Sequence, residues 1–186
     1  MVYADFQELK TPRLVLRRLR LEDATDFFCF GGSEAVTRYM LWRPHKSVEE
    51  SEASIRKALC RYADGKYYRW GISLRETDKL IGMIDLLGFS EEENCCTFAY
   101  MLSAEFWGKG YGTESLKAVL AFAFEKLELS RVEADHFASN AASGAVMRKA
   151  GMSYVCTQLG KYEKDGILYD APWYRITRKE WEKSNS

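Results

Sequence analysis

The segment Trp107-Gly108-Lys109-Gly110-Tyr111-Gly112-Thr113 places three glycines at alternating positions between two regular elements. Residues 95–102, before it, favour a β-strand, and residues 112–127, after it, repeat apolar side chains at helical spacing. The first turn of a helix has N–H groups without intrahelical partners and carries a partial positive charge. Glycines lack a Cβ and let an anion approach the backbone. The segment therefore predicts a diphosphate site at a strand-to-helix junction.

Two other phosphate-binding motifs do not fit this segment. A P-loop needs four residues between its first glycine and a Gly-Lys-Ser/Thr ending, which is absent. A Rossmann fingerprint has the spacing Gly-x-Gly-x-x-Gly and follows a βαβ unit, whereas these glycines alternate strictly and follow a meander. A flexible turn before a surface helix is the remaining structural interpretation, and the strand-loop-helix context argues against it.

The regions on both sides of the glycine segment predict an α/β (α+β) fold. Its centre is a single mixed, mostly antiparallel sheet flanked by helices. We expect one domain over residues 1–186, with a core from about residue 11 to 177. Strands are expected at 14–19, 68–74, 80–87, 95–102, 131–137, 153–162 and 169–177, and helices at 21–28, 47–62, 112–127 and 141–150.

Several boundary residues support these elements. Gly31 and Gly32 end the first helix, and Gly65 closes the second. Ser47 with Glu50 predicts a capping box at the start of the second helix. The polar tail after Trp181 is expected to fray.

Composition excludes several classes of function. The 186 residues contain 27 Lys plus Arg and 27 Asp plus Glu, so direct nucleic-acid binding is not expected. The five cysteines include no Cys-x-x-Cys pair, which gives a metal site little support and predicts reduced thiols in a cytoplasmic protein. The N-terminus has no signal-peptide pattern, and no uncharged stretch is long enough to span a membrane.

The loop residues resemble the acetyl-CoA motif of the GNAT superfamily of N-acetyltransferases, Gln/Arg-x-x-Gly-x-Gly/Ala, at the same junction. Gly110 and Gly112 match its two small positions, and Trp107 stands where Gln or Arg is usual. Trp followed by Gly-Lys-Gly-Tyr, a small residue, Thr and Glu is typical of the RimJ/RimL-like branch, whose members acetylate N-terminal amines of ribosomal proteins among other acceptors. The resemblance runs from about Thr11 to Ile176, through residues 11–17, 22–24, 140–143 and 149–152.

This resemblance implies the GNAT fold and direct transfer of an acetyl group from acetyl-CoA to a primary amine in a ternary complex, without a metal. It allows a homodimer. In the family, a backbone N–H at a bulge before the loop donates to the thioester carbonyl, and the bulge separates that strand from residues 131–137. The residues expected to bind acetyl-CoA are Met101, Leu102, Trp107, Gly108, Lys109, Gly110, Tyr111, Gly112, Thr113, Asn140 and Ser143.

The resemblance also suggests catalytic residues. The serine of the RimL-like branch that protonates the departing thiolate matches Ser143, whereas the tyrosine that other branches use corresponds to Met147. Asn140 is expected to bind the pantetheine arm or a water, or to act as a plain N-cap. The glutamate base of many relatives corresponds to Thr97, so His136 is a candidate base beside a water relay. Glu133 and Asp135 lie on the same strand as His136.

The sequence leaves the acceptor open. A protein N-terminal amine is expected first; a small amine (amino acid, polyamine or drug) and a non-catalytic CoA-binding sensor are the alternatives. Arg38, Arg43 and His45 lie between the first two helices, on the expected acceptor side. Aromatic residues expected either to line the acceptor pocket or to fill the core are Tyr39, Trp42, Tyr67, Tyr68, Trp70, Tyr169, Trp173 and Tyr174.

Overall fold

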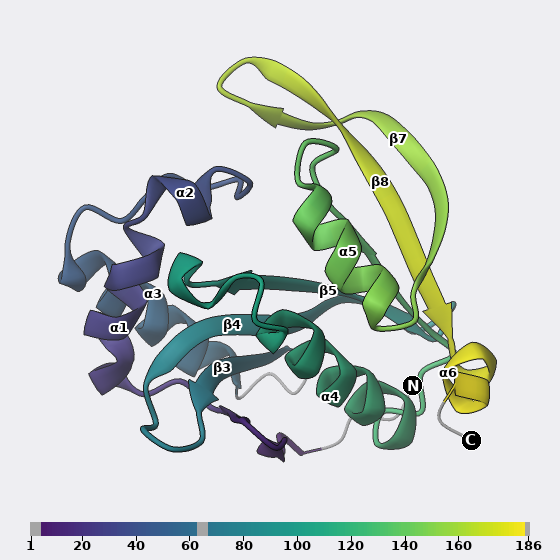
Figure 1. Ribbon diagram of the computed structural model, residues 1–186, viewed down its shortest axis with the longest axis horizontal. Helices are drawn as coiled ribbons and strands as arrows, with labels where there is room; N and C mark the ends of the chain where they lie inside the picture. The colour runs from purple at the N-terminus through teal and green to yellow at the C-terminus, as the bar shows by residue number, and fades with distance from the viewer. Residues whose placement is uncertain (1–4, 63–66, 185–186) are drawn as a thin grey trace.

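Figure 1 shows the computed structural model, which describes residues 5–62 and 67–184. The strands are β1 (Leu9–Lys10), β2 (Leu14–Arg17), β3 (Tyr68–Leu74), β4 (Leu80–Ser90), β5 (Cys95–Leu102), β6 (Arg131–Asp135), β7 (Ser153–Lys164) and β8 (Ile167–Thr177). The α-helices are α1 (Ala24–Gly31), α2 (Glu34–Thr37), α3 (Val48–Arg61), α4 (Tyr111–Glu125), α5 (Ala141–Lys149) and α6 (Arg178–Ser184), and the 3-10 helices include η1 (Leu21–Asp23) and η3 (Ala104–Phe106).

The strands form one mixed sheet in the order β1-β2-β3-β4-β5-β6-β8-β7. Every neighbouring pair is antiparallel except β5 and β6, which are parallel. The meander β3-β4-β5 and the mostly antiparallel sheet flanked by helices confirm the expected fold class. In the part of the chain that the structure describes, no helix is long and apolar enough to cross a bilayer.

Apolar side chains fill both faces of the sheet. The buried side chains of α4, including Val119 and Leu120, pack in the same cluster as Ile84 of β4. Ile55 of α3 packs in a second cluster with Met83, which precedes Ile84 on the same strand. Successive strand residues point to opposite faces, so β4 contributes to both cores. The helices therefore cover the sheet from two sides (Figure 1).

The sheet opens between β5 and β6. The two strands pair at only three positions, from Cys95 opposite Arg131 to Thr97 opposite Glu133. Beyond them β5 stays paired with β4 as far as Leu102, whereas β6 stays paired with β8 to Asp135. The predicted separation of these strands is confirmed, and α5 lies beside the gap in Figure 1.

The bulge that was expected to cause this separation is absent from its predicted place. The register between β4 and β5 runs without a shift from Leu87 opposite Thr97 to Gly82 opposite Leu102, so the prediction of a bulge at Met101 and Leu102 is wrong. A shift near the other end of β5, between Leu87 and Ser90, lies on β4. The strands separate because the chain after β6 follows β8, as the bond from the Ala138 N–H to the Asp170 carbonyl shows.

Other sequence predictions need correction. Ser47 is the N-cap of α3, but its side chain makes no cap hydrogen bond; Glu50 accepts instead from the Lys46 N–H at 2.8 Å. Short elements β1 and α2 were not expected. The tail beyond Trp181 does not fray at that residue, because α6 continues to Ser184 and Trp181 packs on Phe124. Gly65 lies outside the described residues.

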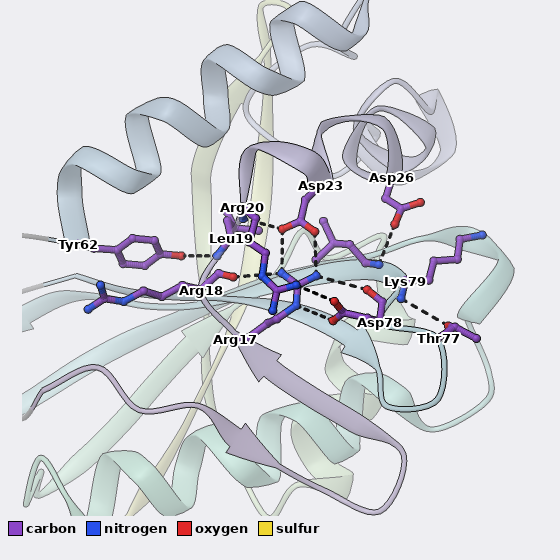
Figure 2. A network of polar contacts seen from close by, with 11 residues as sticks. Arg17, Arg18, Leu19, Arg20, Asp23, Asp26, Tyr62, Thr77, Asp78 and Lys79 are labelled. Carbon is purple, nitrogen blue, oxygen red and sulfur yellow. Dashed lines mark hydrogen bonds and ion pairs between the residues drawn. The ribbon is translucent and has the colours of Figure 1, made fainter.

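A buried ion network fixes the start of the chain to the meander (Figure 2). Arg17, only 4% exposed, binds both carboxylate oxygens of Asp23 at 2.8 and 2.9 Å. Its Nε also donates to Asp78 at 2.8 Å in the β3–β4 turn, and exposed Arg20 shares Asp78 at 2.7 Å. Burial acts to lower the pKa of Arg17, but Asp23 and Asp78 outweigh it and hold the pKa above its ordinary value. The network thereby joins β2, η1 and the β3–β4 turn.

Replacing Arg17 by Met should destabilise the protein by about 3 kcal/mol, because the buried Asp23 carboxylate loses its cation. Replacing Arg20 by Met should cost less than about 1 kcal/mol, because its pair with Asp78 is exposed to solvent. Urea unfolding of the two variants measures both losses. Equal losses would contradict the central role of Arg17.

Candidate active site

One cavity of about 520 Å³ lies where the open end of β5, the glycine loop and the start of α5 meet. Its walls come from β5, η3, the loop, the first turn of α4, one face of α5 with the segment before it, and α2 with the segment after it. It gathers all the residues expected at acetyl-CoA except Lys109, whose side chain is not part of the wall. The lining residues are Ala35, Val36, Tyr39, Met40, Tyr100, Met101, Leu102, Phe106, Trp107, Gly108, Gly110, Tyr111, Gly112, Thr113, Ser139, Asn140, Ala141, Ala142, Ser143, Ala145, Val146 and Lys149.

The glycine loop presents an open helix end to this cavity. Gly110 is the N-cap of α4 with φ 84°, and Gly108 has φ 72°, a left-handed conformation that suits glycine. A Cβ on Gly108 would have no atom within 4 Å, so the approach to the backbone is clear. No side chain caps α4, which leaves the N–H groups of its first turn open to an anion.

Residues far from the loop in sequence hold it in this shape. The guanidinium of Arg13 donates to the Lys109 carbonyl at 2.9 Å and lies 4.2 Å from the centre of the Tyr111 ring. Arg13 also binds Glu114 of α4 at 2.6 Å, and Thr11 donates to the same carboxylate at 2.6 Å. Burial acts to raise the pKa of Glu114, but Thr11 and Arg13 outweigh it and hold the pKa below its usual value.

Trp107 closes the loop back onto the strand before it. Its indole N–H donates to the Leu102 carbonyl at 2.7 Å, and the side chain remains 48% exposed. The tryptophan therefore fills the position between the end of β5 and the glycines. A Gln or Arg there, as in other GNAT branches, would present a flexible polar group in place of this ring.

The edge of β5 that faces the gap offers backbone groups without a strand partner. Ser103 N–H donates to the Ile81 carbonyl at 2.8 Å, and antiparallel hydrogen bonding alternates from residue to residue. The Met101 N–H therefore faces β4, and the N–H groups of Leu102 and Tyr100 face the gap, where pairing with β6 has ended. Of the two backbone N–H groups expected to act as the donor, that of Leu102 faces the gap and that of Met101 faces β4.

The start of α5 forms the opposite wall. Asn140 is its N-cap, and its side-chain oxygen accepts from the Ser143 N–H at 3.3 Å, which confirms the N-cap interpretation. Ser143 is 7% exposed, and its hydroxyl lies next to the phenol of Tyr100, which comes from β5 on the other side of the cavity. Burial raises the pKa of Tyr100, and the Ser143 hydroxyl opposes part of that shift. Two hydroxyls that hold their protons at neutral pH are thus adjacent.

The candidate bases do not reach the cavity. His136 is buried behind α5 with Nδ1 2.8 Å from the Phe137 carbonyl oxygen, and its Nε2 lies 2.6 Å from where a Gly144 Cβ would stand. Asp135 is bound by Lys161 and Tyr162, and Glu133 by Arg131. None of the described residues that line the cavity is Asp, Glu or His.

Met147 and Thr97 also lie outside the cavity wall. Met147, at the family's tyrosine position, is buried in the core. Thr97, at the glutamate position, donates its hydroxyl to the Leu87 carbonyl at 3.0 Å. Neither side chain is available to a reacting group in the cavity.

Most of the aromatic residues expected either at the acceptor pocket or in the core lie outside the cavity wall. Tyr67, Tyr68, Trp70 and Tyr174 are buried. Trp42 packs on His45 with ring centres 5.0 Å apart. Only Tyr39 of that set lines the cavity, and its hydroxyl donates to the Ser139 carbonyl at 3.2 Å.

Sequence reasoning missed part of the cavity wall. Tyr100 shares its strand face with Leu102, two residues on, which is a signal that strand alternation supplies. Val146 and Lys149 follow Ser143 at intervals of three residues on α5, which places them on one helix face. No local pattern indicates Ala35, Val36 or Met40, because α2 reaches the cavity only through the tertiary fold.

Comparison with known proteins identifies the family. The model of the acetyltransferase (GNAT) domain matches residues 13–153. The uncharacterized N-acetyltransferase YoaA of Bacillus subtilis (strain 168) is 30% identical over 173 residues, which cover 93% of this chain and 98% of YoaA. Among solved structures, a GNAT-family acetyltransferase from Bacillus anthracis superposes with a TM-score of 0.84 at 20% identity, over 93% of this chain and 99% of that one.

Two further solved structures share the fold and contain CoA. Spermidine N-acetyltransferase from Vibrio cholerae, in complex with CoA and spermine, has a TM-score of 0.78 at 18% identity and covers 92% of this chain and 99% of its own. RimL, a ribosomal alpha-N-protein acetyltransferase in complex with CoA, has a TM-score of 0.80 at 17% identity and covers 92% and 98%. With the family model and YoaA, these findings show that the chain is an N-acetyltransferase that belongs to the GNAT family.

Proposed function

We propose that the protein transfers an acetyl group from acetyl-CoA to the α-amino group of a protein N-terminus, as in the RimJ/RimL-like branch. The observation that carries this proposal is the continuity of one cavity from the open N-terminus of α4 to the unpaired edge of β5. The helix end suits a diphosphate, and the strand edge suits an extended arm with amide groups. Acetyl-CoA has both parts in that order.

In this arrangement the N–H groups at the start of α4 hold the diphosphate, and Gly108 and Gly110 let it approach. Arg13 and Glu114 keep the loop in shape without entering the cavity wall. Lys109 adds no side chain to the wall, so its contribution is the backbone carbonyl that Arg13 binds.

Replacing Gly110 by Glu should weaken CoA binding by more than about tenfold, because a side chain at φ 84° strains the loop and its carboxylate repels the diphosphate. Gly166→Glu is the matched control: this glycine has φ 77° in the β7–β8 turn and lies outside the cavity wall. Calorimetry with CoA measures both variants. Equal affinity of Gly110→Glu and the wild type would exclude the loop as the diphosphate site.

The transfer needs a donor for the carbonyl oxygen as negative charge develops on it. The Leu102 N–H, which faces the gap, meets that need without any side chain. Ser143 then passes its proton to the departing thiolate and takes up the proton that the amine nitrogen releases as the amide forms, since its hydroxyl lies in the cavity wall and Tyr100 adjoins it. Asn140 positions Ser143 through the bond to its backbone N–H.

Replacing Ser143 by Ala should lower kcat by about a hundredfold, because the thiolate loses its proton donor. CoA affinity should be retained, since the loop and the edge of β5 are unchanged. Ser73→Ala, which removes another fully buried serine hydroxyl outside the cavity, should retain kcat. Thiol release followed at saturating acetyl-CoA measures the effect, and an unchanged kcat in Ser143→Ala would refute its role as the acid.

The lack of a carboxylate or imidazole in the described cavity wall favours an α-amine as acceptor. An α-amino group has a pKa of about 7.7–8.0, so about a tenth of it is neutral at pH 7 without help from a base. An alkyl amine with a pKa near 10.4 is neutral in only about one molecule in a few thousand. A polyamine would also bring further ammonium groups, for which this wall provides no acid. Small molecules with α-amines remain the second candidate class.

The dependence of kcat/KM on pH should follow the acceptor and not the enzyme. The rate should rise with pH up to the pKa of the acceptor amine and level off above it, because only the neutral amine reacts. Two peptides whose N-terminal pKa values differ should give breaks that differ by the same interval. The same break for both peptides would indicate an enzymatic base and contradict the proposal.

The homodimer and the cytoplasmic location stay predictions.

A further inference from the structure

The β7–β8 hairpin extends well past the end of β6. β8 pairs with β6 only from Trp173 to Thr177, whereas the hairpin continues to Lys164 opposite Ile167. Asp165 and Gly166 form the turn, both with positive φ, which is typical of tight hairpin turns. Figure 1 shows the hairpin arching over α5 with its tip on the side of α2.

The tip holds α2 through a single ammonium group. Lys164 Nζ donates to the backbone carbonyls of Thr37 at 3.0 Å, Arg38 at 3.0 Å and Met40 at 2.8 Å. We call these three bonds the Lys164 tether. They place a cation at the C-terminal end of α2, where the helix dipole favours it. All three donor positions of the ammonium are thereby used.

Helix α2 depends on such support because it is a single turn of four residues. An isolated helix of that length is not stable in water, so its position must come from tertiary contacts. Residues of α2 and of the segment after it form the cavity wall farthest along the chain from the glycine loop: Ala35, Val36, Tyr39 and Met40. Tyr39 also joins this wall to the segment before α5 through the Ser139 carbonyl.

We propose that Lys164 is a positioning residue for acceptor specificity: the tether fixes the α2 wall of the cavity and thereby holds the acceptor, not acetyl-CoA. The inference rests on the proposed function, since it assigns the α2 wall to the amine. The glycine loop and the β5 edge account for acetyl-CoA without α2. Lys164 itself does not line the cavity, so it acts through α2.

The test compares Lys164→Met, which keeps a long side chain without its charge, with Lys164→Arg, which restores donors for the carbonyls. Lys164→Met should raise KM for an N-terminal peptide acceptor by about tenfold, because hydrogen bonds from a charged donor are strong. The kcat at saturating acceptor and the CoA affinity by calorimetry should stay near wild type. Lys164→Arg should recover at least part of the loss. Lys10→Met, which removes the same charge from an exposed pair with Glu8 at the β1 edge of the sheet, should change none of these values.

A second measurement does not depend on turnover. Amide hydrogen exchange over residues 34–40 should become faster in Lys164→Met and remain near wild type in Lys10→Met, since only the first variant loses the tether. In Lys164→Met, unchanged exchange or an unchanged acceptor KM would each overturn the inference. A loss of CoA affinity as large as the change in acceptor KM would also overturn it. A wild-type protein that acetylates no amine would instead overturn the proposed function, while the exchange experiment would still decide whether the tether holds α2.

Discussion

The hydrogen-bond ladder of β5 ends on one side while the strand continues. A buried backbone N–H without a partner costs about 1–3 kcal/mol, so a gap of this kind in a sheet has to be met by water or by a ligand. Two helix N-termini adjoin the gap, that of α4 after the glycine loop and that of α5 at Asn140. The strand edge supplies donors in a line, and the helix ends supply a positive potential at each side of it. The rest of the molecule keeps these three parts in place.

The positive potential at the two helix N-termini acts on both substrates. Helix N-termini attract a diphosphate and disfavour a cation, and the acids near the gap are already neutralised by Lys161 and Arg131. No residue that the structure describes in the cavity wall offers a carboxylate to an amine that enters as ammonium, whereas a neutral amine needs none. Under the proposed function, a site that binds a dianion for this reason also favours the unprotonated acceptor, which needs no base.

Much of the fold could be predicted from the sequence because periodicity is a local property. The bounds of β3 and β5 and the course of α4 follow from patterns of 2 and 3.6 residues. Elements of two to four residues, such as β1 and α2, carry too little pattern to be recognised. The loop could be found because its residues are contiguous. The Lys164 tether and the Arg13–Glu114 pair join residues more than a hundred positions apart, and no local signal indicates them.

The backbone N–H expected as the carbonyl donor at the end of β5 shows a further limit of prediction from sequence. The resemblance to the family limited the expected carbonyl donor to the N–H of Met101 or Leu102. Which of the two faces the gap depends on the strand register, because successive N–H groups point to opposite edges of the strand. The bulge expected from the family is missing there, and β6 leaves β5 by following β8 instead. The open edge in this chain therefore arises from the course of the chain after β6 along β8, without a bulge in β5 at Met101 or Leu102.

Trp107 gives the site an optical label of its own. Its indole is half exposed at the cavity wall and hydrogen-bonded to Leu102, whereas Trp70 of β3 is fully buried. Indole emission depends on the polarity of the surroundings, so a ligand that covers Trp107 shifts its spectrum. The other four tryptophans lie outside the cavity wall: Trp42, Trp70, Trp173 and Trp181. The residue that replaces the usual Gln or Arg of the motif therefore makes occupancy of the loop visible by fluorescence, without any added dye.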